Sequence, residues 1–126
     1  MATEESLRTV NLLSDDDHSS HQYHAVKVAD ENDDGDFELC AEGDAGLGIL
    51  QDKPSAEGEP GLIGTHGRSK AKAGAAFGKG VALTPGSSGK LVAAGTGDVP
   101  FATSLEVALA DGDIVSVFVN PQIPTI

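Results

Sequence analysis

Apolar and polar residues alternate with a period of two along most of this chain from Tyr23 onward, which is the pattern of half-buried β-strands. Segments rich in Gly, Pro and Asp interrupt the alternating runs and are typical of turns. The runs recur at roughly 8–12-residue intervals, as in small barrels and sandwiches. We therefore predict an all-β domain, a small β-barrel of about seven short strands, within segments 23–28, 37–42, 47–50, 62–72, 81–84, 90–94 and 114–119.

The alternation also assigns side chains to faces of the predicted strands. Three sets each share one face: His24, Val26 and Val28; Phe37, Leu39 and Ala41, which point inward; and Leu62, His66, Arg68, Lys70 and Lys72. Segment 114–119 is apolar on both faces, which predicts a central buried strand. Segment 101–109 fits either a strand or a short helix, and Gly48 marks a bend or a close backbone approach.

The chain of 126 residues is long enough for one domain with its own core. Residues 1–21 are predicted to be a flexible, acidic N-terminal arm, because this polar segment buries too little apolar surface to order itself. Its apolar residues could form one helical turn or dock on a neighbour, and they are Leu7, Val10, Leu12 and Leu13. Residues 22–120 form the predicted β-barrel domain, and 121–126 are a C-terminal tail.

The formal net charge of −12 disfavours nucleic acid as a direct partner, because the chain repels phosphates. Residues 1–44 hold 13 of the 20 acidic residues, whereas Arg68, Lys70 and Lys72 share one strand face. Such a basic stripe either keeps a solvated sheet edge from aggregating or contacts an acidic patch on a partner.

Cellular location is constrained by what the chain lacks. With a single cysteine, Cys40, no disulfide can form within the chain. No apolar run approaches the roughly 20 residues of a membrane-spanning helix, and the acidic N-terminus does not resemble a signal peptide. We expect synthesis in a reducing cytoplasm and no membrane partner.

One acidic segment resembles the start of a calcium-binding loop. Oxygen ligands recur at alternate positions around Gly35, at Asp30, Asn32, Asp34 and Asp36. The twelfth position is Ala41, where a calcium loop needs a bidentate Glu. An acidic hairpin turn is therefore the favoured interpretation, and these residues stay weak metal candidates.

Three other features could carry chemistry, and each has a simpler interpretation. His18, His21 and His24 are spaced by three, but they do not lie on one predicted rigid element, so no specific metal site is expected. Lys53 faintly resembles the lysine turn of lipoyl carrier domains, although Pro54 disrupts the strand that should follow. Cys40 fits a small, half-buried filler. No nucleophile motif or phosphate loop occurs, so neither enzymatic activity nor a cofactor is expected.

The order of several segments resembles that of tailed-bacteriophage capsid decoration (cement) proteins. These segments are LGILQDKP at 47–54, a Gly/Glu loop, GTHGRSKA at 64–71, an Ala-Gly loop, GVALT at 80–84, SGKLV at 88–92 and ALADGDIVSVFV at 108–119. The likeness covers about residues 22–120. The Asp-rich N-terminal third departs from the family pattern and leaves the use of the arm open.

The resemblance implies a β-barrel or β-tulip fold that binds the outside of the assembled, expanded capsid as a homotrimer and stabilises it. The partners would be the major capsid protein and other copies of this chain, and the location would be the capsid surface of the virion. The basic stripe of Arg68, Lys70 and Lys72, together with the apolar residues of the arm, would then contact the capsid or a neighbouring subunit.

Two other classes of function remain open from the residues. A calcium-dependent surface or adhesion module built on the acidic turn would melt at a higher temperature with calcium. A lipoyl-like carrier would hold a covalent adduct on Lys53. A capsid decoration protein would show neither property.

Overall fold

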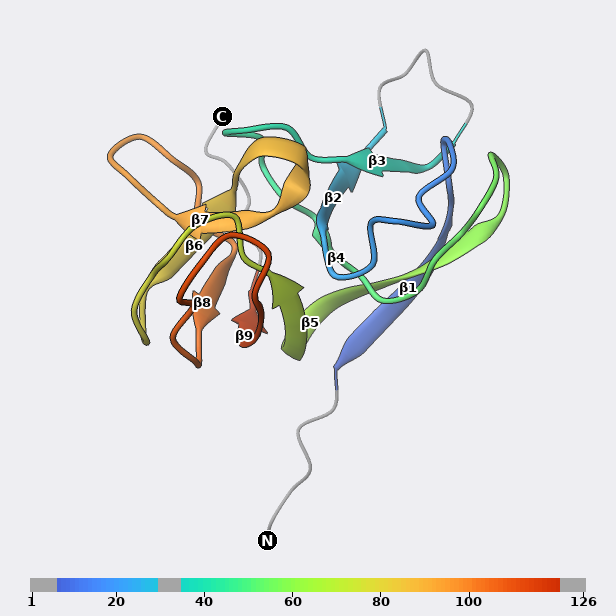
Figure 1. The fold of residues 1–126 in the computed structure, drawn as a ribbon. Coiled ribbons are helices and arrows are strands. Elements are labelled where there is room, and N and C mark those ends of the chain that lie inside the picture. Colours follow the sequence, from blue (N-terminus) through green and yellow to red (C-terminus); the bar gives the residue numbers. More distant parts are fainter. Residues whose placement is uncertain (1–6, 30–34, 121–126) are drawn as a thin grey trace, which may run out of the picture.

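The computed structural model describes residues 7–29 and 35–120. These residues form nine strands and no α-helix (Figure 1), which confirms the predicted all-β class and gives two strands more than the predicted seven. The strands are β1 (Arg8–Leu13), β2 (Ala25–Val28), β3 (Phe37–Leu39), β4 (Gly48–Leu50), β5 (Pro60–Lys72), β6 (Ala82–Pro85), β7 (Leu91–Ala93), β8 (Ala102–Ser104) and β9 (Ile114–Val119). One 3-10 turn, η1 (Ser87–Gly89), separates β6 from β7.

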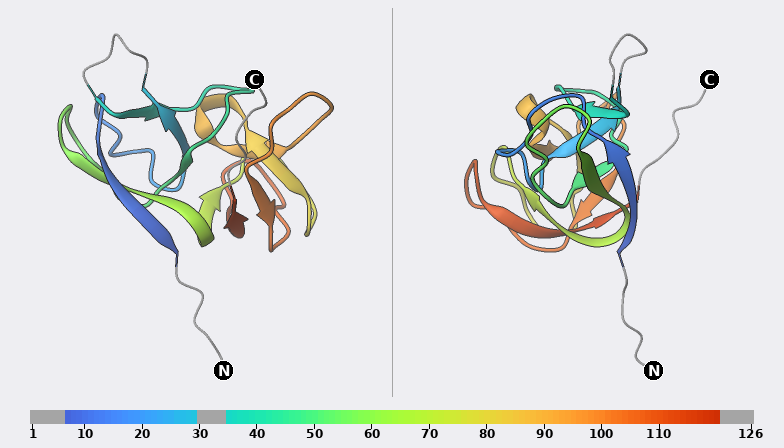
Figure 2. Two further views of the ribbon diagram at one scale, coloured as in Figure 1. Left: turned by 180° about the vertical axis from the view of Figure 1, so that it is seen from behind. Right: turned by 90° about the vertical axis from the view of Figure 1, so that its right-hand side faces the viewer.

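All nine strands pair antiparallel in one curled sheet. Eight of them follow the order β3-β2-β4-β5-β9-β8-β6-β7, and β1 pairs with β5 outside this path. The long strand β5 joins its two halves: the first part of β5 pairs with β1 and β4, and the second part pairs with β9. Figures 1 and 2 show β1–β4 curling around one part of β5 and β6–β9 around the other. The sheet is therefore a half-barrel with β5 as its spine.

The core consists of two apolar clusters. The smaller cluster consists of Val26, Phe37, Leu50 and Ile63, with Leu12 of β1 packed against it. The larger cluster combines side chains of β5–β9, among them the fully buried Leu83, Val117 and Val119, with Ala25 of β2 and Ile49 of β4, so it connects the two halves of the sheet. Burial of these side chains is the main favourable term in folding, at about 25 cal/mol per Å² of apolar surface.

The alternation along β5 follows the sequence prediction. Ser69 and Ala71 are buried, whereas Arg68 and Lys70 are exposed. Gly48 of β4 also behaves as predicted, because a Cβ atom at this position would lie 2.4 Å from the Gly64 carbonyl oxygen. Only glycine permits β4 and β5 to approach so closely.

The prediction that segment 114–119 is buried on both faces is wrong. Val115, Val117 and Val119 face the core, but Ile114 is 52% exposed and Phe118 is 41% exposed. β9 lies between β5 and β8, and no second layer covers its outer face in the described part of the chain. The apolar outer face of β9 is therefore available to a partner.

Some strand ends also differ from the predicted alternation. Val28 is 66% exposed, while the consecutive residues His24, Ala25 and Val26 are buried. Cys40 is buried in place of Ala41, because β3 ends at Leu39 and the Cys40 N–H then donates to the Ala25 carbonyl. In segment 101–109 only Ala102–Ser104 is a strand, and no helix follows within it.

The part of the predicted arm that the structure describes contains β1. Arg8–Leu13 pairs antiparallel with β5 rather than forming a helical turn. Residues 1–6 and 121–126 lie outside the described residues, so the proposed arm, domain and tail boundaries stay predictions. The described residues contain no helix that is long and apolar enough to cross a membrane.

Candidate functional site

The predicted basic stripe lies on the outward face of the second half of β5. Arg68 and Lys70 are exposed and Lys72 is half-buried. None of the three forms an ion pair with another residue in segments 7–29 and 35–120, whereas Lys27 and Lys90 do. Their charges are therefore available to an external acidic group.

The neighbouring strand adds apolar side chains to the same surface. In the antiparallel register, Arg68 is opposite Phe118 and Lys72 is opposite Ile114. Directly opposed residues project from the same face of a sheet. This outer face of β5 and β9 thus combines cations with exposed apolar groups, a composition found at protein interfaces.

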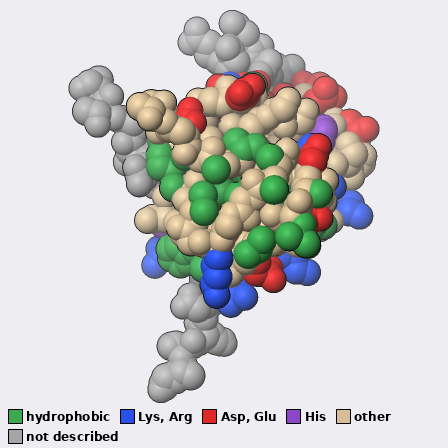
Figure 3. All heavy atoms as spheres, turned by 60° about the vertical axis from the view of Figure 1, so that its left-hand side comes forward, with side chains coloured by type: hydrophobic (Ala, Val, Ile, Leu, Met, Phe, Trp, Pro, Cys, Tyr) green, Lys and Arg blue, Asp and Glu red, His purple; other side chains and the backbone are tan. Residues whose placement is uncertain are grey.

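The charges on the molecule are unevenly placed. On the face shown in Figure 3, Lys and Arg side chains lie mainly toward the lower edge and many Asp and Glu side chains lie toward the upper edge. Glu106 is an acidic residue near the stripe, and its carboxylate accepts a hydrogen bond of 2.6 Å from the Ser116 N–H. This bond, and in smaller measure the charge of Arg68, lowers the pKa of Glu106, so it stays ionised beside the stripe.

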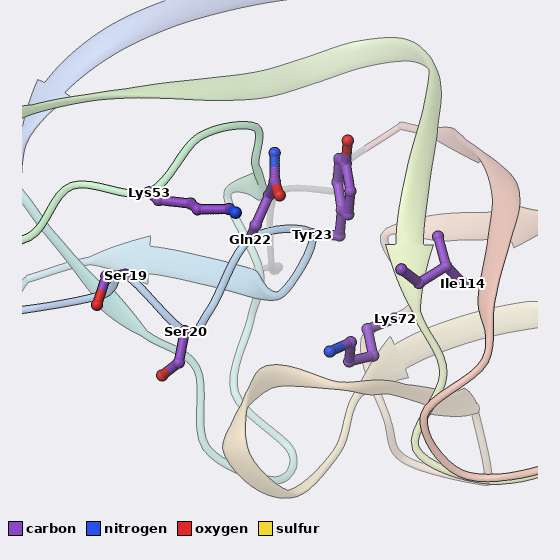
Figure 4. A pocket seen from close by; sticks show the side chains of 7 residues that line it. All are labelled: Ser19, Ser20, Gln22, Tyr23, Lys53, Lys72 and Ile114. Atoms are coloured by element: carbon purple, nitrogen blue, oxygen red, sulfur yellow. The ribbon is translucent and has the colours of Figure 1, made fainter.

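A pocket of about 250 Å³ continues from the end of the stripe. Its lining comes from the segment before β2, the β4–β5 loop, β5 and β9, and consists of Ser19, Ser20, Gln22, Tyr23, Lys53, Lys72 and Ile114. Figure 4 shows Lys53 and Lys72 on different segments of the pocket lining. None of the seven lining side chains is acidic.

Backbone hydrogen bonds hold the pocket in place. The Tyr23 N–H donates to the Leu50 carbonyl at 2.7 Å, and the Lys72 N–H donates to the Tyr23 carbonyl at 3.0 Å. A side-chain bond adds to these, because the Gln22 Nε2 donates to the Gln51 carbonyl at 2.9 Å. Tyr23 has a φ of 71°, a conformation that is uncommon for a residue other than glycine. Such local strain is maintained where surrounding contacts fix the backbone, and it occurs often at functional sites.

The three histidines lie together, but not as a metal site. His18 Nε2 lies 2.7 Å from an Asp15 carboxylate oxygen, and His18 Nδ1 lies 2.9 Å from His21 Nδ1. With neutral rings, His18 donates to Asp15 and accepts from His21. His24 Nδ1 instead donates to the Ser88 carbonyl at 2.7 Å. Over the described ranges, no group of three or more His, Cys, Asp or Glu residues is placed to hold a metal ion.

Most of the acidic turn lies outside the described residues, including Asp30, Asn32 and Asp34. Asp36 is described, and its carboxylate accepts a hydrogen bond of 3.0 Å from the Leu13 N–H. The Asp36 N–H also donates to the Leu13 carbonyl at 2.8 Å. Asp36 therefore fixes the end of β1, and the proposed calcium loop stays a weak hypothesis.

Cys40 and Lys53 do not have the surroundings that reactive groups need. Burial raises the pKa of the Cys40 thiol to about 12, so the residue is a protonated thiol at neutral pH. Cys40 is fully buried rather than half-buried, because only 2% of it is exposed. Lys53 lies in the loop between Leu50 and Pro60, not at a tight hairpin tip as in carrier domains.

The four apolar residues of the predicted arm separate into two pairs. Leu12 packs on the smaller core cluster, and the Leu7 side chain lies over Gly64. Val10 is 39% exposed and Leu13 is 45% exposed, so both could contact a partner.

Sequence reasoning missed the pocket and the outer face of β9. The pocket lining comes from positions as far apart as Ser19 and Ile114, and no local motif connects them. For β9, the apolar residues at even positions were a signal, but they were interpreted as core. An exposed apolar face and a buried one read the same in a sequence.

Fold and surface together define a class: a small all-β domain, a half-barrel with an uncovered face of basic and apolar residues. The solved structure of the head fiber gp8.5 N base in bacteriophage phi29 is similar, with a TM-score of 0.72 over 95% of this chain and 100% of that chain. The two sequences are 14% identical, so the likeness shows a shared fold. That neighbour is a bacteriophage head protein, which agrees with the resemblance noted in the sequence. No family model and no curated protein matches this chain.

Proposed function

We propose that this chain is a structural protein of a bacteriophage virion that binds the outside of the assembled, expanded capsid as an oligomer and stabilises it. The shared fold is the observation that carries this proposal, because it extends over 95% of this chain and the whole of a phage head protein domain. The segment order independently resembles that of capsid decoration proteins.

The outer face of β5 and β9 supplies a plausible contact surface. Arg68 and Lys70 are exposed cations on a chain with a net charge of −12, so they favour an acidic partner patch over nucleic acid. Ile114 and Phe118 add apolar area that association would bury. The partners are the major capsid protein and further copies of this chain, arranged as a homotrimer.

A structural role of this kind requires no reaction. Individual exposed ion pairs contribute only about 0.2–1 kcal/mol. A symmetric oligomer that contacts several capsid subunits at once multiplies such weak terms through effective concentration. The proposed site of action is the virion surface, after synthesis in the host cytoplasm.

The test is binding to heads of the virus that encodes this chain. Purified protein mixed with expanded, DNA-filled heads should cosediment to a saturating, stoichiometric level and raise the temperature at which the heads rupture. Unexpanded heads are the matched comparison and should bind less. Absence of saturation, or an unchanged rupture temperature with the sites filled, contradicts the proposal.

A second candidate function, the base of a head fibre, is favoured by the identity of the structural neighbour. That chain is the N base of a head fiber, and all of it is covered by the likeness. This chain could likewise be the base by which a fibre attaches to the head. Electron micrographs of native virions distinguish the candidates, because a fibre base carries a projecting rod and a decoration protein leaves compact knobs.

A further inference from the structure

We propose that the pocket between Lys53 and Lys72 binds the carboxylate of an Asp or Glu side chain on the capsid shell. This inference rests on the proposed function and adds an anchoring site to the more general contact through the basic stripe.

The charge of the pocket is the first argument. Two lysines from separate segments share its lining, and no acidic side chain belongs to that lining. Neither lysine forms an ion pair within the described ranges 7–29 and 35–120. An anion that enters this pocket therefore meets two cationic side chains of its lining and no acidic one.

The remaining lining suits a side-chain carboxylate. Ile114 offers apolar contact for the methylene groups of Asp or Glu, and the Ser19 and Ser20 hydroxyls add hydrogen-bonding groups at the lining. A volume of about 250 Å³ accommodates one such side chain with part of its backbone. The pocket therefore has the size and the chemistry for a single protruding acidic residue.

The position of the pocket connects it to the stripe. Lys72 belongs to both, since it follows Lys70 along the outward face of β5 and also lines the pocket. An acidic loop that lies along the stripe would reach the pocket at its end. A protein carboxylate is favoured over a nucleic acid phosphate, because a polyanion would meet the strong overall negative charge of this chain.

The pocket is built to hold its shape without a ligand. The segment that carries Ser19 to Tyr23 is tied by hydrogen bonds from Tyr23 to Leu50, from Gln22 to Gln51 and from Lys72 to Tyr23. A site that is already organised loses less conformational entropy when it binds. Side-chain substitutions at Lys53 and Lys72 leave these bonds intact.

The first experiment uses the full, isotopically labelled chain and the dipeptide N-acetyl-Glu-Glu-amide at constant ionic strength. We expect saturable amide shifts at Gln22, Tyr23, Lys53 and Lys72. Lys53→Gln and Lys72→Gln should each weaken binding by about threefold, in line with half-exposed charge pairs. The double variant should show no saturation, and Lys79→Gln, which removes one charge from another loop, should bind like the wild type.

Three outcomes would overturn the carboxylate site: no saturable shift, equal binding by the double variant, or tighter binding of inorganic phosphate than of the dipeptide. The second experiment measures binding of the double variant to expanded heads, which should fall about tenfold. Unchanged head binding in that variant rejects the anchoring role and leaves the proposed function standing. If the wild-type chain binds no heads, the proposed function fails, whereas a saturable dipeptide titration still supports the carboxylate site.

Discussion

Arg68 on β5 lies directly opposite Phe118 on β9, so a guanidinium and a partly exposed aromatic ring project from the same outward face of the sheet. Arg and aromatic residues are the types that most often dominate binding energy at interfaces. The pair marks the surface that we assign to contact with a partner.

Charge reversal on the basic stripe should weaken capsid binding. Arg68→Glu with Lys70→Glu places two acids where two exposed cations stood, and we expect at least about a tenfold loss of affinity for expanded heads. Both side chains face solvent, so the free protein should melt within a few degrees of the wild type. Cosedimentation measures the first effect and thermal unfolding the second.

The matched control for the stripe is Lys79→Glu, which makes the same charge change per residue on the exposed loop before β6. Its binding should equal that of the wild type. Unchanged binding of the double stripe variant would remove the stripe from the contact surface.

Truncation of Leu12 should destabilise the fold, because this side chain packs on the smaller core cluster. Leu12→Ala should lower the free energy of unfolding by about 1–2 kcal/mol, less than the 2–5 kcal/mol of a fully buried leucine. Val10→Ala is the control on the same strand, and its exposed side chain should cost under about 0.5 kcal/mol. Urea unfolding of both variants checks this; equal stabilities would mean that β1 does not pack as described.

The backbone contact at Gly48 should not tolerate a side chain. Gly48→Ala places a Cβ atom 2.4 Å from the Gly64 carbonyl oxygen, so β4 and β5 must separate. We expect a loss of about 1–3 kcal/mol, as for other overpacked cores. Gly95→Ala is the control, because its Cβ would lie at an ordinary 3.5 Å from its nearest neighbour, the Asp98 carboxylate. Comparable stabilities of the two variants in urea would contradict the close approach.

Stability should fall in mild acid. Burial lowers the pKa of both His21 and His24 from 6.5, further helped by the charges of neighbouring histidines and Lys72, with Lys90 also facing His24. Asp17 opposes this shift at His21, and the hydrogen bond to Ser88 opposes it at His24. In mild acid the unfolded chain therefore binds more protons than the folded chain. The contribution of these histidines to the free energy of unfolding is fully present above about pH 6.5 and decreases as the pH falls through that value.

Melting temperatures between pH 8 and pH 5 measure this effect. A His21→Gln, His24→Gln double variant should show a flatter pH dependence than the wild type, whereas His66→Gln, at an exposed site on β5, should not. A wild-type melting temperature that does not change through pH 6.5 would contradict the lowered pKa of His21 and His24.

The Cys40 thiol should be inert in the folded protein. Because only 2% of the residue is exposed and its pKa is about 12, iodoacetamide at pH 8 should not react until the chain unfolds. Mass spectrometry with and without denaturant measures this. Rapid alkylation of the native protein would place Cys40 at the surface.

The all-β class and the basic stripe could be predicted from the alternation of apolar and polar residues alone. On β5, each second residue from Arg68 to Lys72 faces outward, as a period of two requires. The prediction fails where tertiary contacts decide burial. Phe118 is apolar but uncovered, and His24 is polar but buried because it bonds the distant Ser88 carbonyl.

The pocket could not be predicted, since its lining comes from four separate segments of the chain. Lys53 and Lys72 line one pocket because the segment before β2 lies beside both β4 and the end of β5, through the hydrogen bonds of Tyr23 with Leu50 and Lys72. No spacing in the sequence encodes that arrangement. The conformation of residues 8–13 could not be predicted either. This segment is a strand because it pairs with β5, not because its own residues alternate.

The most direct test of the account is an electron cryomicroscopy reconstruction of expanded, DNA-filled heads with this chain bound. We predict ordered density on the outer surface, at threefold or quasi-threefold positions, with the outer faces of β5 and β9 turned toward the shell or toward a neighbouring copy. Heads that carry no such density, or density in which Arg68 and Phe118 both face open solvent, would contradict it.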